Sequence, residues 1–387
     1  MYDHHGSMTV ADPILSAKEA VERLLAGMTQ HEASDLHIKA GYPPFYRIAG
    51  HLRKLDMPPF PDSQYIEAML MSLVPEARRP EFQQHGALDF SVKGSTGDRY
   101  RVNIYRAAGE THASIRRVQS RIPSFEELRL PDVYRQTVIN SSDGLILISG
   151  ITGCGKSTTL AAMVEHINQH RSMHVITIED PIEYIFHPKK SIISQREIGV
   201  DVPSYHEALR YMVRQDPDCI LIGELRDRDT MTAALQAAET GHLVLGSLHV
   251  SDVQQTFARI LEFFPREEHA FLRSSLANSL RAILCQKLVP GIEEGSRYPA
   301  TEVLLRNSTV RDKILHEEDE DLPAIIAGSE GEGMRSFTSS LCELIETEKV
   351  HYDTAMEFAP SREALASAVK GIKASAQGLV GRSRGAR

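Results

Sequence analysis

The stretch from Gly150 to Ser157 constrains the fold of this chain more than any other, because it reads GITGCGKS. An apolar run at 145–149 precedes it, and apolar residues at helical spacing follow it over 160–167. Glycines between a strand and a helix let the backbone curl, so that its N–H groups and the helix N-terminus converge on a phosphate. The pattern predicts an α/β domain that binds a phosphorylated ligand, and the flanking strand and helix argue against a chance glycine turn.

The polar side chains of this loop predict a nucleoside triphosphate with Mg²⁺. Lys156 would reach the β- and γ-phosphates, the Ser157 hydroxyl would bind Mg²⁺, and Thr158 would support the α-phosphate. We therefore expect ATP and Mg²⁺ as cofactors. The residues expected to contact the nucleotide are Gly150, Thr152, Gly153, Cys154, Gly155, Lys156, Ser157 and Thr158.

A second apolar strand is predicted in CILIGELRD (219–227), and it ends at Gly223-Glu224. A carboxylate at that strand end would sit beside the glycine loop, where it can orient or deprotonate an attacking water. The alternative is a surface glutamate at a strand exit. Gly223 stands where an Asp usually precedes this Glu, so Mg²⁺ would depend on Ser157, water and other carboxylates.

Two further segments carry candidate site residues. Glu179, Asp180 and Glu183 place three carboxylates in five residues, which would hold Mg²⁺-bound waters or form a solvated acidic loop. His242 and His249 bracket a predicted strand and fall on opposite faces of it, which argues against a shared metal. Either could sense the γ-phosphate, or both could be structural histidines.

Six arginines concentrate between residues 99 and 121. They form either a solvated basic face or arginine fingers delivered across a domain or subunit boundary. They are Arg99, Arg101, Arg106, Arg116, Arg117 and Arg121.

The 387 residues suggest two domains, and the hydrophobic periodicity changes between them. Strands alternate with longer helices after about residue 132, and we expect helix over 266–288. The predicted organisation is a leader (1–13), a small mixed domain (14–119), a linker (120–131), the α/β domain with C-terminal helices (132–358) and a disordered tail (359–387).

Composition excludes several classes of protein. The formal net charge of −9 argues against a general affinity for nucleic acid, and so against a DNA-handling ATPase. The four cysteines form no CxxC pair, which excludes a zinc ribbon and a disulfide scaffold and indicates a cytoplasmic protein with reduced thiols. We find neither a secretory signal nor a run of roughly 18 apolar residues that could span a bilayer.

Taken together, these motifs resemble the secretion ATPase superfamily, and within it the PilT-like type IV pilus retraction ATPases. The resemblance runs from about residue 34 to 350. Besides the glycine loop, the segments that carry it are ASDLH (33–37), TIEDPIEY (177–184), IGELRD (222–227) and AAETGHLVLGSLH (237–249).

The resemblance implies a PAS-like α+β N-terminal domain joined to a RecA-like P-loop ATPase domain, assembled as a homo-hexamer. Such a ring would work in the cytoplasm at the inner face of the cytoplasmic membrane. It would turn an inner-membrane platform protein and so drive pilus retraction and twitching motility.

The resemblance also assigns residue roles. Glu224 would be the catalytic glutamate, and Glu179 and Asp180 would act through Mg²⁺ and water. The roles implied for the remaining residues are closure over the nucleotide for Arg101 and Arg116, and coupling of nucleotide state to ring contacts for His242 and His249.

The segment TVRDKILHE (309–317) departs from the family's retraction-linked motif, and the chain extends beyond the usual end. An accessory, PilU-like ring that docks on a paralogous pilus ATPase therefore remains the alternative. The lack of a tetracysteine zinc site and of a large N-terminal extension argues against an extension or type II secretion ATPase.

Overall fold

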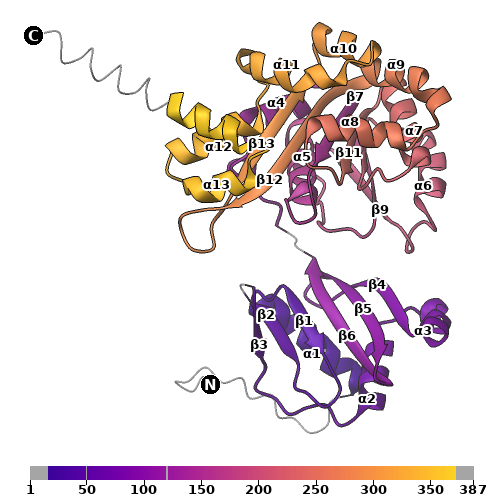
Figure 1. Cartoon of the computed structure of the whole chain (residues 1–387). Helices are drawn as coiled ribbons and strands as arrows, with labels where there is room; N and C mark the ends of the chain where they lie inside the picture. The colour runs from indigo at the N-terminus through magenta and orange to yellow at the C-terminus, as the bar shows by residue number, and fades with distance from the viewer. Residues whose placement is uncertain (1–15, 49, 119–120, 372–387) are drawn as a thin grey trace, which may run out of the picture. The chain divides into compact units, whose positions relative to one another are not determined.

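The computed structural model describes residues 16–48, 50–118 and 121–371. These residues divide into two compact units, one made mainly of residues 16–118 and the other mainly of residues 121–371 (Figure 1). Each unit combines helices with a sheet, so the predicted α/β class is confirmed.

The N-terminal unit is a six-stranded sheet with helices packed on it. The strand order is β3-β2-β1-β6-β5-β4, and every pair of neighbouring strands is antiparallel. Its elements are α1 (Ala17–Gln30), β1 (Asp35–Ile38), β2 (Phe45–Ile48), β3 (His51–Lys54), α2 (Ser63–Met71), α3 (Arg79–His85), β4 (Ala87–Lys93), β5 (Arg99–Ala107) and β6 (Glu110–Val118).

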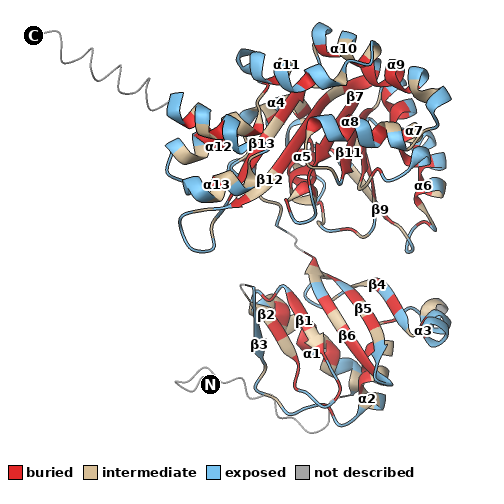
Figure 2. Ribbon diagram, viewed as in Figure 1, coloured by how far each residue is buried: buried red, intermediate tan, exposed pale blue. Residues whose placement is uncertain are grey.

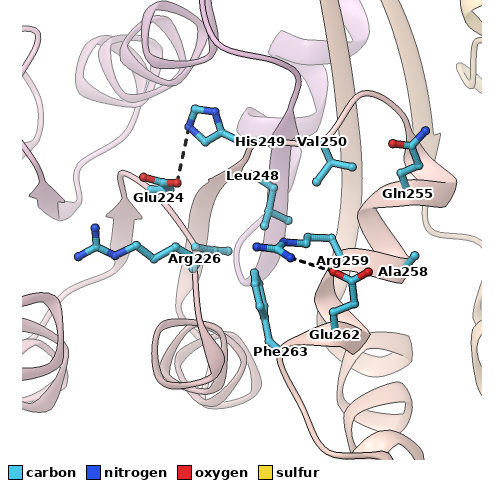
Figure 3. Close-up of a pocket in the computed structure, with 11 residues that line it drawn as sticks. Glu224, Arg226, Leu248, His249, Val250, Gln255, Ala258, Arg259, Glu262 and Phe263 are labelled. Carbon is cyan, nitrogen blue, oxygen red and sulfur yellow. Dashed lines mark hydrogen bonds and ion pairs between the residues drawn. The ribbon is translucent and has the colours of Figure 1, made fainter.

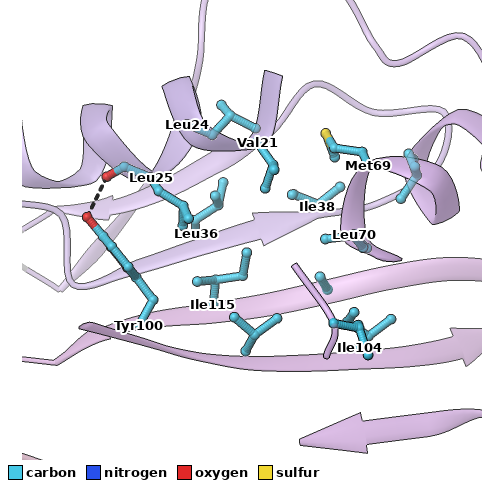
Figure 4. Packing of buried hydrophobic residues seen from close by; sticks show 14 of the residues in the cluster. Val21, Leu24, Leu25, Leu36, Ile38, Met69, Leu70, Tyr100, Ile104 and Ile115 are labelled. Atoms are coloured by element: carbon cyan, nitrogen blue, oxygen red, sulfur yellow. Dashed lines mark hydrogen bonds between the residues drawn. The ribbon is translucent and has the colours of Figure 1, made fainter. Parts of the chain in front are cut away.

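The core of this unit follows from the spacing of apolar residues on α1. Val21, Leu24, Leu25 and Met28 lie on one helical face, and all four are buried. Figure 4 shows this face directed at the strands, where the Tyr100 hydroxyl also donates to the Leu25 carbonyl at 2.8 Å. The unit is the PAS-like α+β domain.

The second unit is built on a seven-stranded sheet in the order β13-β12-β7-β11-β10-β8-β9. β12, β7, β11, β10 and β8 run parallel, and β13 pairs antiparallel with β12. Its strands are β7 (Gly144–Ser149), β8 (His174–Glu179), β9 (Ile192–Glu197), β10 (Cys219–Ile222), β11 (Leu243–Leu248), β12 (Leu280–Pro290) and β13 (Arg297–Leu305).

Helices cover this sheet, and the strands β7, β10 and β11 are buried along their whole length (Figure 2). Strands covered on both faces need continuous apolar runs, which is the pattern that these three segments have. The helices are α4 (Asp132–Asn140), α5 (Lys156–His170), α6 (Tyr205–Met212), α7 (Arg228–Glu239), α8 (Val253–Glu262), α9 (His269–Ser279), α10 (Ser308–Leu315), α11 (Leu322–Gly328), α12 (Phe337–Glu346) and α13 (Tyr352–Phe358).

Two expectations need correction in this unit. The helix predicted over 266–288 ends at Ser279, and the remainder is strand β12, because a short apolar run does not by itself distinguish helix from strand. Residues 362–371, expected to be disordered, are helical, since Leu365 and Val369 lie one turn apart and are buried. The rest of the predicted tail and the predicted leader (1–13) lie outside the described residues.

Residues 121–131, most of the expected linker, contain neither helix nor strand, and residues 122–131 belong to the second unit. Phe125 is buried and sets its ring against His166 at a centroid distance of 5.6 Å. The guanidinium of Arg129 lies 4.1 Å from the centre of the Tyr298 ring. Residue 120 lies outside the described residues.

Across residues 16–48, 50–118 and 121–371, we find no helix with both the length and the apolar character required to cross a bilayer.

Candidate active site

The glycine loop joins β7 to α5 in a backbone conformation suited to holding an anion. Gly150, Gly153 and Gly155 all have positive φ, at 157°, 81° and 93°. Gly155 is the N-cap of α5 and provides no side-chain cap, so the first N–H groups of a 15-residue helix face outward from its N-terminus. These N–H groups and the helix dipole favour a phosphate at this point.

The loop is packed so closely that its shape depends on glycine. A Cβ atom at Gly150 would lie 2.4 Å from the Cys154 sulfur and 2.6 Å from the Gln286 carbonyl oxygen. The thiol of Cys154 is itself buried, and burial raises its pKa. The conformation that presents the N–H groups is therefore set by contacts that a side chain at residue 150 would destroy.

Gln286 on β12 holds the loop from beneath, and sequence reasoning missed it. Its Nε2 donates to the Cys154 carbonyl at 2.7 Å, and its Oε1 accepts from the Thr159 hydroxyl on α5 at 3.0 Å. The side chain is buried. One amide thus ties the loop to the helix that follows it, and the only sequence signal was a polar residue within an apolar run.

Lys156 is buried and points back into the loop. Its Nζ donates to the carbonyl oxygens of Gly150 at 2.7 Å and Ile151 at 3.2 Å. The same Nζ lies 3.4 Å from Nδ1 of His249. A loop that already gathers the ammonium group around its own carbonyls positions a cation where phosphate oxygens would arrive.

Glu224 and His249 follow two neighbouring parallel strands, β10 and β11, and β11 in turn pairs with β7. Nε2 of His249 is 3.7 Å from Oε1 of Glu224, and the Thr152 hydroxyl is 3.4 Å from Nδ1. Burial and the charge of Lys156 lower the pKa of His249, against the opposing effect of Glu224. A neutral imidazole can accept at Nδ1 and donate from Nε2, and so connect the loop to the carboxylate.

The peptide on either side of Glu224 is fixed by Ser247 of β11, which sequence reasoning also missed. The Ser247 hydroxyl donates to the Gly223 carbonyl at 2.5 Å, and its carbonyl accepts from the Leu225 N–H at 2.9 Å. A Cβ at Gly223 would lie 3.2 Å from the Ile178 carbonyl oxygen and 3.3 Å from the Tyr205 hydroxyl. A side chain at residue 223 would therefore require these neighbours to shift by a few tenths of an ångström.

A pocket of about 410 Å³ opens beside this pair, between the loop that follows β10 and helix α8. Glu224 and His249 line it together with Arg226, Arg259 and Phe263 (Figure 3). Arg259 forms an ion pair with Glu262 at 2.8 Å across its floor, which leaves the lining close to neutral in charge.

Glu179 and Asp180 stand at the carboxyl end of β8, the strand next to β10. Oε1 of Glu179 accepts from the Thr177 hydroxyl at 2.6 Å and from Nε2 of Gln195 at 3.2 Å. Burial raises the pKa of Tyr205, and the charges of Asp180, Glu224 and Glu179 raise it further, so these carboxylates surround one phenol.

The donor set suits Mg²⁺ bound mainly through phosphate and water. In the part of the chain that the structure describes, no three His, Cys, Asp or Glu side chains gather closely enough to form a metal cage of their own. Ser157 is the second residue of α5, directly after the loop. Mg²⁺ commonly keeps several waters and takes few protein ligands when it arrives with a nucleotide, which this arrangement permits.

One candidate residue does not join this group. His242 precedes β11, so the six residues of that strand place it about 20 Å from His249, at the opposite edge of the sheet. Its Nδ1 bonds to the Ala237 carbonyl at 3.0 Å. The prediction that His242 contacts the nucleotide is therefore wrong for the loop of its own chain, because His242 lies at the amino end of β11 and the loop follows the carboxyl end of β7, the parallel neighbour of β11.

Arg101 and Arg116 belong to the N-terminal unit. They are direct cross-strand partners on β5 and β6, and both side chains are exposed. Arg116 bonds to Asp35 at 2.8 Å, whereas Arg101 is 3.8 Å from Asp89.

A glycine loop that opens a helix, a buried lysine inside it and a carboxylate at a neighbouring strand end define a P-loop ATPase of the RecA-like type. Known proteins agree with this class. The family described as "Type II/IV secretion system protein" matches residues 14–327.

Two curated proteins of Pseudomonas aeruginosa are similar over most of their length. The type IV pilus retraction ATPase PilT is 36% identical, covering 87% of this chain and 97% of its own. The type IV pilus ATPase PilU is also 36% identical, covering 90% and 91%. A crystal structure of the pilus retraction motor PilT with bound ADP has a TM-score of 0.84 at 36% identity, over 90% of this chain and 99% of that one.

The chain therefore belongs to the type II/IV secretion system protein family, and it is an ATPase similar to PilT and PilU.

Proposed function

We propose that this chain is the ATP-hydrolysing motor of type IV pilus retraction and twitching motility, acting as a ring of six copies on an inner-membrane platform protein. The observation that supports it most is the connection from Lys156 through His249 to Glu224 at one edge of the sheet. A relative named as a retraction ATPase, similar over 87% of the chain, supplies the biological setting.

The loop and its lysine would hold the phosphates, and Glu224 would orient the attacking water or take its proton. Bound Mg²⁺ would neutralise charge on the phosphate oxygens, held by Ser157 and, through water, by Glu179 and Asp180. His249, as a neutral imidazole that accepts at Nδ1 and donates from Nε2, would report the presence of the γ-phosphate to Glu224 by a change in its hydrogen bonds.

Mechanical work requires that the two units respond to the nucleotide. We assign Arg101 and Arg116 to closure over its phosphates, supported by their exposed, adjacent positions on β5 and β6. His242, at the far edge of the sheet, would couple to contacts between copies in the ring. The ring would operate in the cytoplasm against the inner face of the membrane.

ATP turnover tests the chemical part of this proposal. Glu224→Gln should still bind a fluorescent ATP analogue but hydrolyse ATP about 10²- to 10⁴-fold more slowly, since the water loses its base. Lys156→Ala should lose binding itself. Glu357→Gln, a carboxylate-to-carboxamide change at an exposed position on α13, is the matched control and should behave as wild type. If both single variants, Glu224→Gln and Lys156→Ala, hydrolysed ATP at the wild-type rate, the assignment would be refuted.

Imaging of surface pili tests the biological part. A strain lacking the gene should carry excess pili and fail to twitch, and the wild-type chain should restore retraction where Glu224→Gln does not. A normal number of pili in the deletion strain would refute a role in retraction, and the assignment of ATPase activity would still stand.

An accessory ring that docks on a paralogous pilus ATPase is the second candidate. Equal identity to PilU favours it, as does the divergent segment at 309–317, most of which forms α10. Slow hydrolysis by the isolated chain, accelerated by addition of the paralogous ring, would favour this role. Full turnover by the isolated chain, with no effect of the paralogue, would exclude it.

A further inference from the structure

The loop that carries His249 leads directly into helix α8, and side chains from two other strands, β7 and β13, bond to the residues between His249 and the start of the helix. The Val250 carbonyl accepts from the Ser149 hydroxyl of β7 at 2.8 Å. Three residues further on, the Val253 N–H donates to Oε2 of Glu302 on β13 at 2.8 Å. The path from His249 to Glu302 therefore consists of four consecutive residues and one hydrogen bond.

Glu302 satisfies a backbone group that helices otherwise leave open. The first N–H groups of a helix lack partners within it. At α8, Asp252 caps the Gln255 N–H at 2.8 Å, and Glu302 takes the Val253 N–H. A carboxylate from a distant strand thus sets where the first turn of α8 begins, and the helix dipole favours its negative charge.

The surroundings of Glu302 combine burial with mixed charge. Asp252 on α8 repels its ionised form, and Lys287 on β12 attracts it. Cys285, its cross-strand partner on β12, and Tyr134 on α4 also interact with its charge. Lys287 is occupied elsewhere, since its Nζ donates to the Phe358 carbonyl at 3.1 Å.

We propose that Glu302 is a positioning residue for ATP hydrolysis: by holding the Val253 N–H it fixes the start of α8, and through residues 250–252 it fixes the imidazole of His249 against the P-loop and Glu224. The inference rests on hydrolysis at the P-loop and is independent of pilus retraction.

Protonation provides a readout that a purely structural role would not move. Burial, with repulsion by Asp252, raises the pKa of Glu302 to about 7. The ionised form is the stronger acceptor for an N–H group. Turnover should therefore rise with pH through about 7 in the wild type. Glu302→Gln keeps an acceptor oxygen but cannot titrate, so this part of the profile should disappear.

The experiment measures kcat and KM for ATP between pH 5.5 and 8.5 in the full chain. Glu302→Ala should lower kcat about tenfold at pH 8 with KM changed less than twofold, because the loop that binds phosphate is intact. Glu302→Gln should retain kcat within about threefold at pH 8 and flatten its pH dependence. Asp62→Asn, a helix-capping carboxylate of α2 in the other unit, is the matched control.

Thermal unfolding without nucleotide gives a second, activity-free measurement. When a carboxyl group has a higher pKa in the folded state than in the unfolded state, the protein becomes less stable as the pH rises from the lower pKa to the higher one. The midpoint for Glu302→Gln minus that for the wild type should therefore increase by about 3–5 °C between pH 5 and pH 8. If Glu302→Ala fails to fold, the pH dependence of kcat in Glu302→Gln carries the test of the positioning role.

The inference would be overturned if kcat of Glu302→Gln fell below pH 7 as it does in the wild type (the acid limb of the profile), or if a folded Glu302→Ala kept the wild-type kcat. Either result would leave ATP hydrolysis established. Absence of turnover in the wild-type chain would instead refute the proposed function. Loss of the acid limb in Glu302→Gln, with the Asp62→Asn profile unchanged, would establish the positioning role.

Discussion

Replacement of Gln286 by Leu tests whether the phosphate loop is held in shape by a single buried amide. The substitution leaves two groups without partners, the Cys154 carbonyl, bonded at 2.7 Å, and the Thr159 hydroxyl, bonded at 3.0 Å. Both lie in the interior, where an unsatisfied polar group costs about 1–3 kcal/mol. The added apolar surface of Leu returns about 1–2 kcal/mol.

The midpoints of these ranges give a net loss in the free energy of unfolding of about 2–3 kcal/mol. For a unit of this size, that corresponds to a fall of roughly 4–12 °C in Tm, measured at one protein concentration. ATP affinity should fall as well, because part of the binding energy would then be used to order the loop. Gln236→Leu, on the exposed face of α7, should change the stability by less than about 0.5 kcal/mol.

A double-mutant cycle with Thr159→Val isolates the bond between these two side chains. The two substitutions should be non-additive by about 1 kcal/mol, since each removes one partner of the same hydrogen bond. If the effects simply add, or if Gln286→Leu keeps both its Tm within 2 °C and its ATP affinity, the amide does not organise the loop.

Three further outcomes follow from the site. In the Glu302→Gln background, turnover should hold through the pH range in which a free histidine titrates and decline only below it, because burial and the charge of Lys156 lower the pKa of His249 and the neutral imidazole is needed; a pH–rate profile checks this. Gly150→Ala should destabilise the protein by about 1–3 kcal/mol in thermal denaturation, since its methyl group would overlap the loop. Ser247→Ala should lower kcat more than it raises KM, because it frees the peptide that carries Glu224; steady-state kinetics measure the split.

Local patterns in the sequence predicted the elements that carry the chemistry. The GITGCGKS loop needed only its own glycines and the flanking apolar residues, and Glu224 needed only the end of a buried strand. The apolar face of α1 was also evident from spacing alone. In each case the signal lies within about a dozen consecutive residues, which is the range over which strand, loop and helix patterns act.

Pairing between distant strands decided the rest. Gln286 lies more than a hundred residues beyond the loop it supports, in a segment expected to be helical. Glu302 lies on β13, the antiparallel neighbour of β12, and accepts from the first N–H of α8. His242 and His249 belong to one motif, yet they lie at opposite ends of strand β11. The sequence alone determined which residues can do chemistry here, but only the tertiary structure decided which of them meet, because a hydrogen bond between strands depends on register and not on separation along the chain.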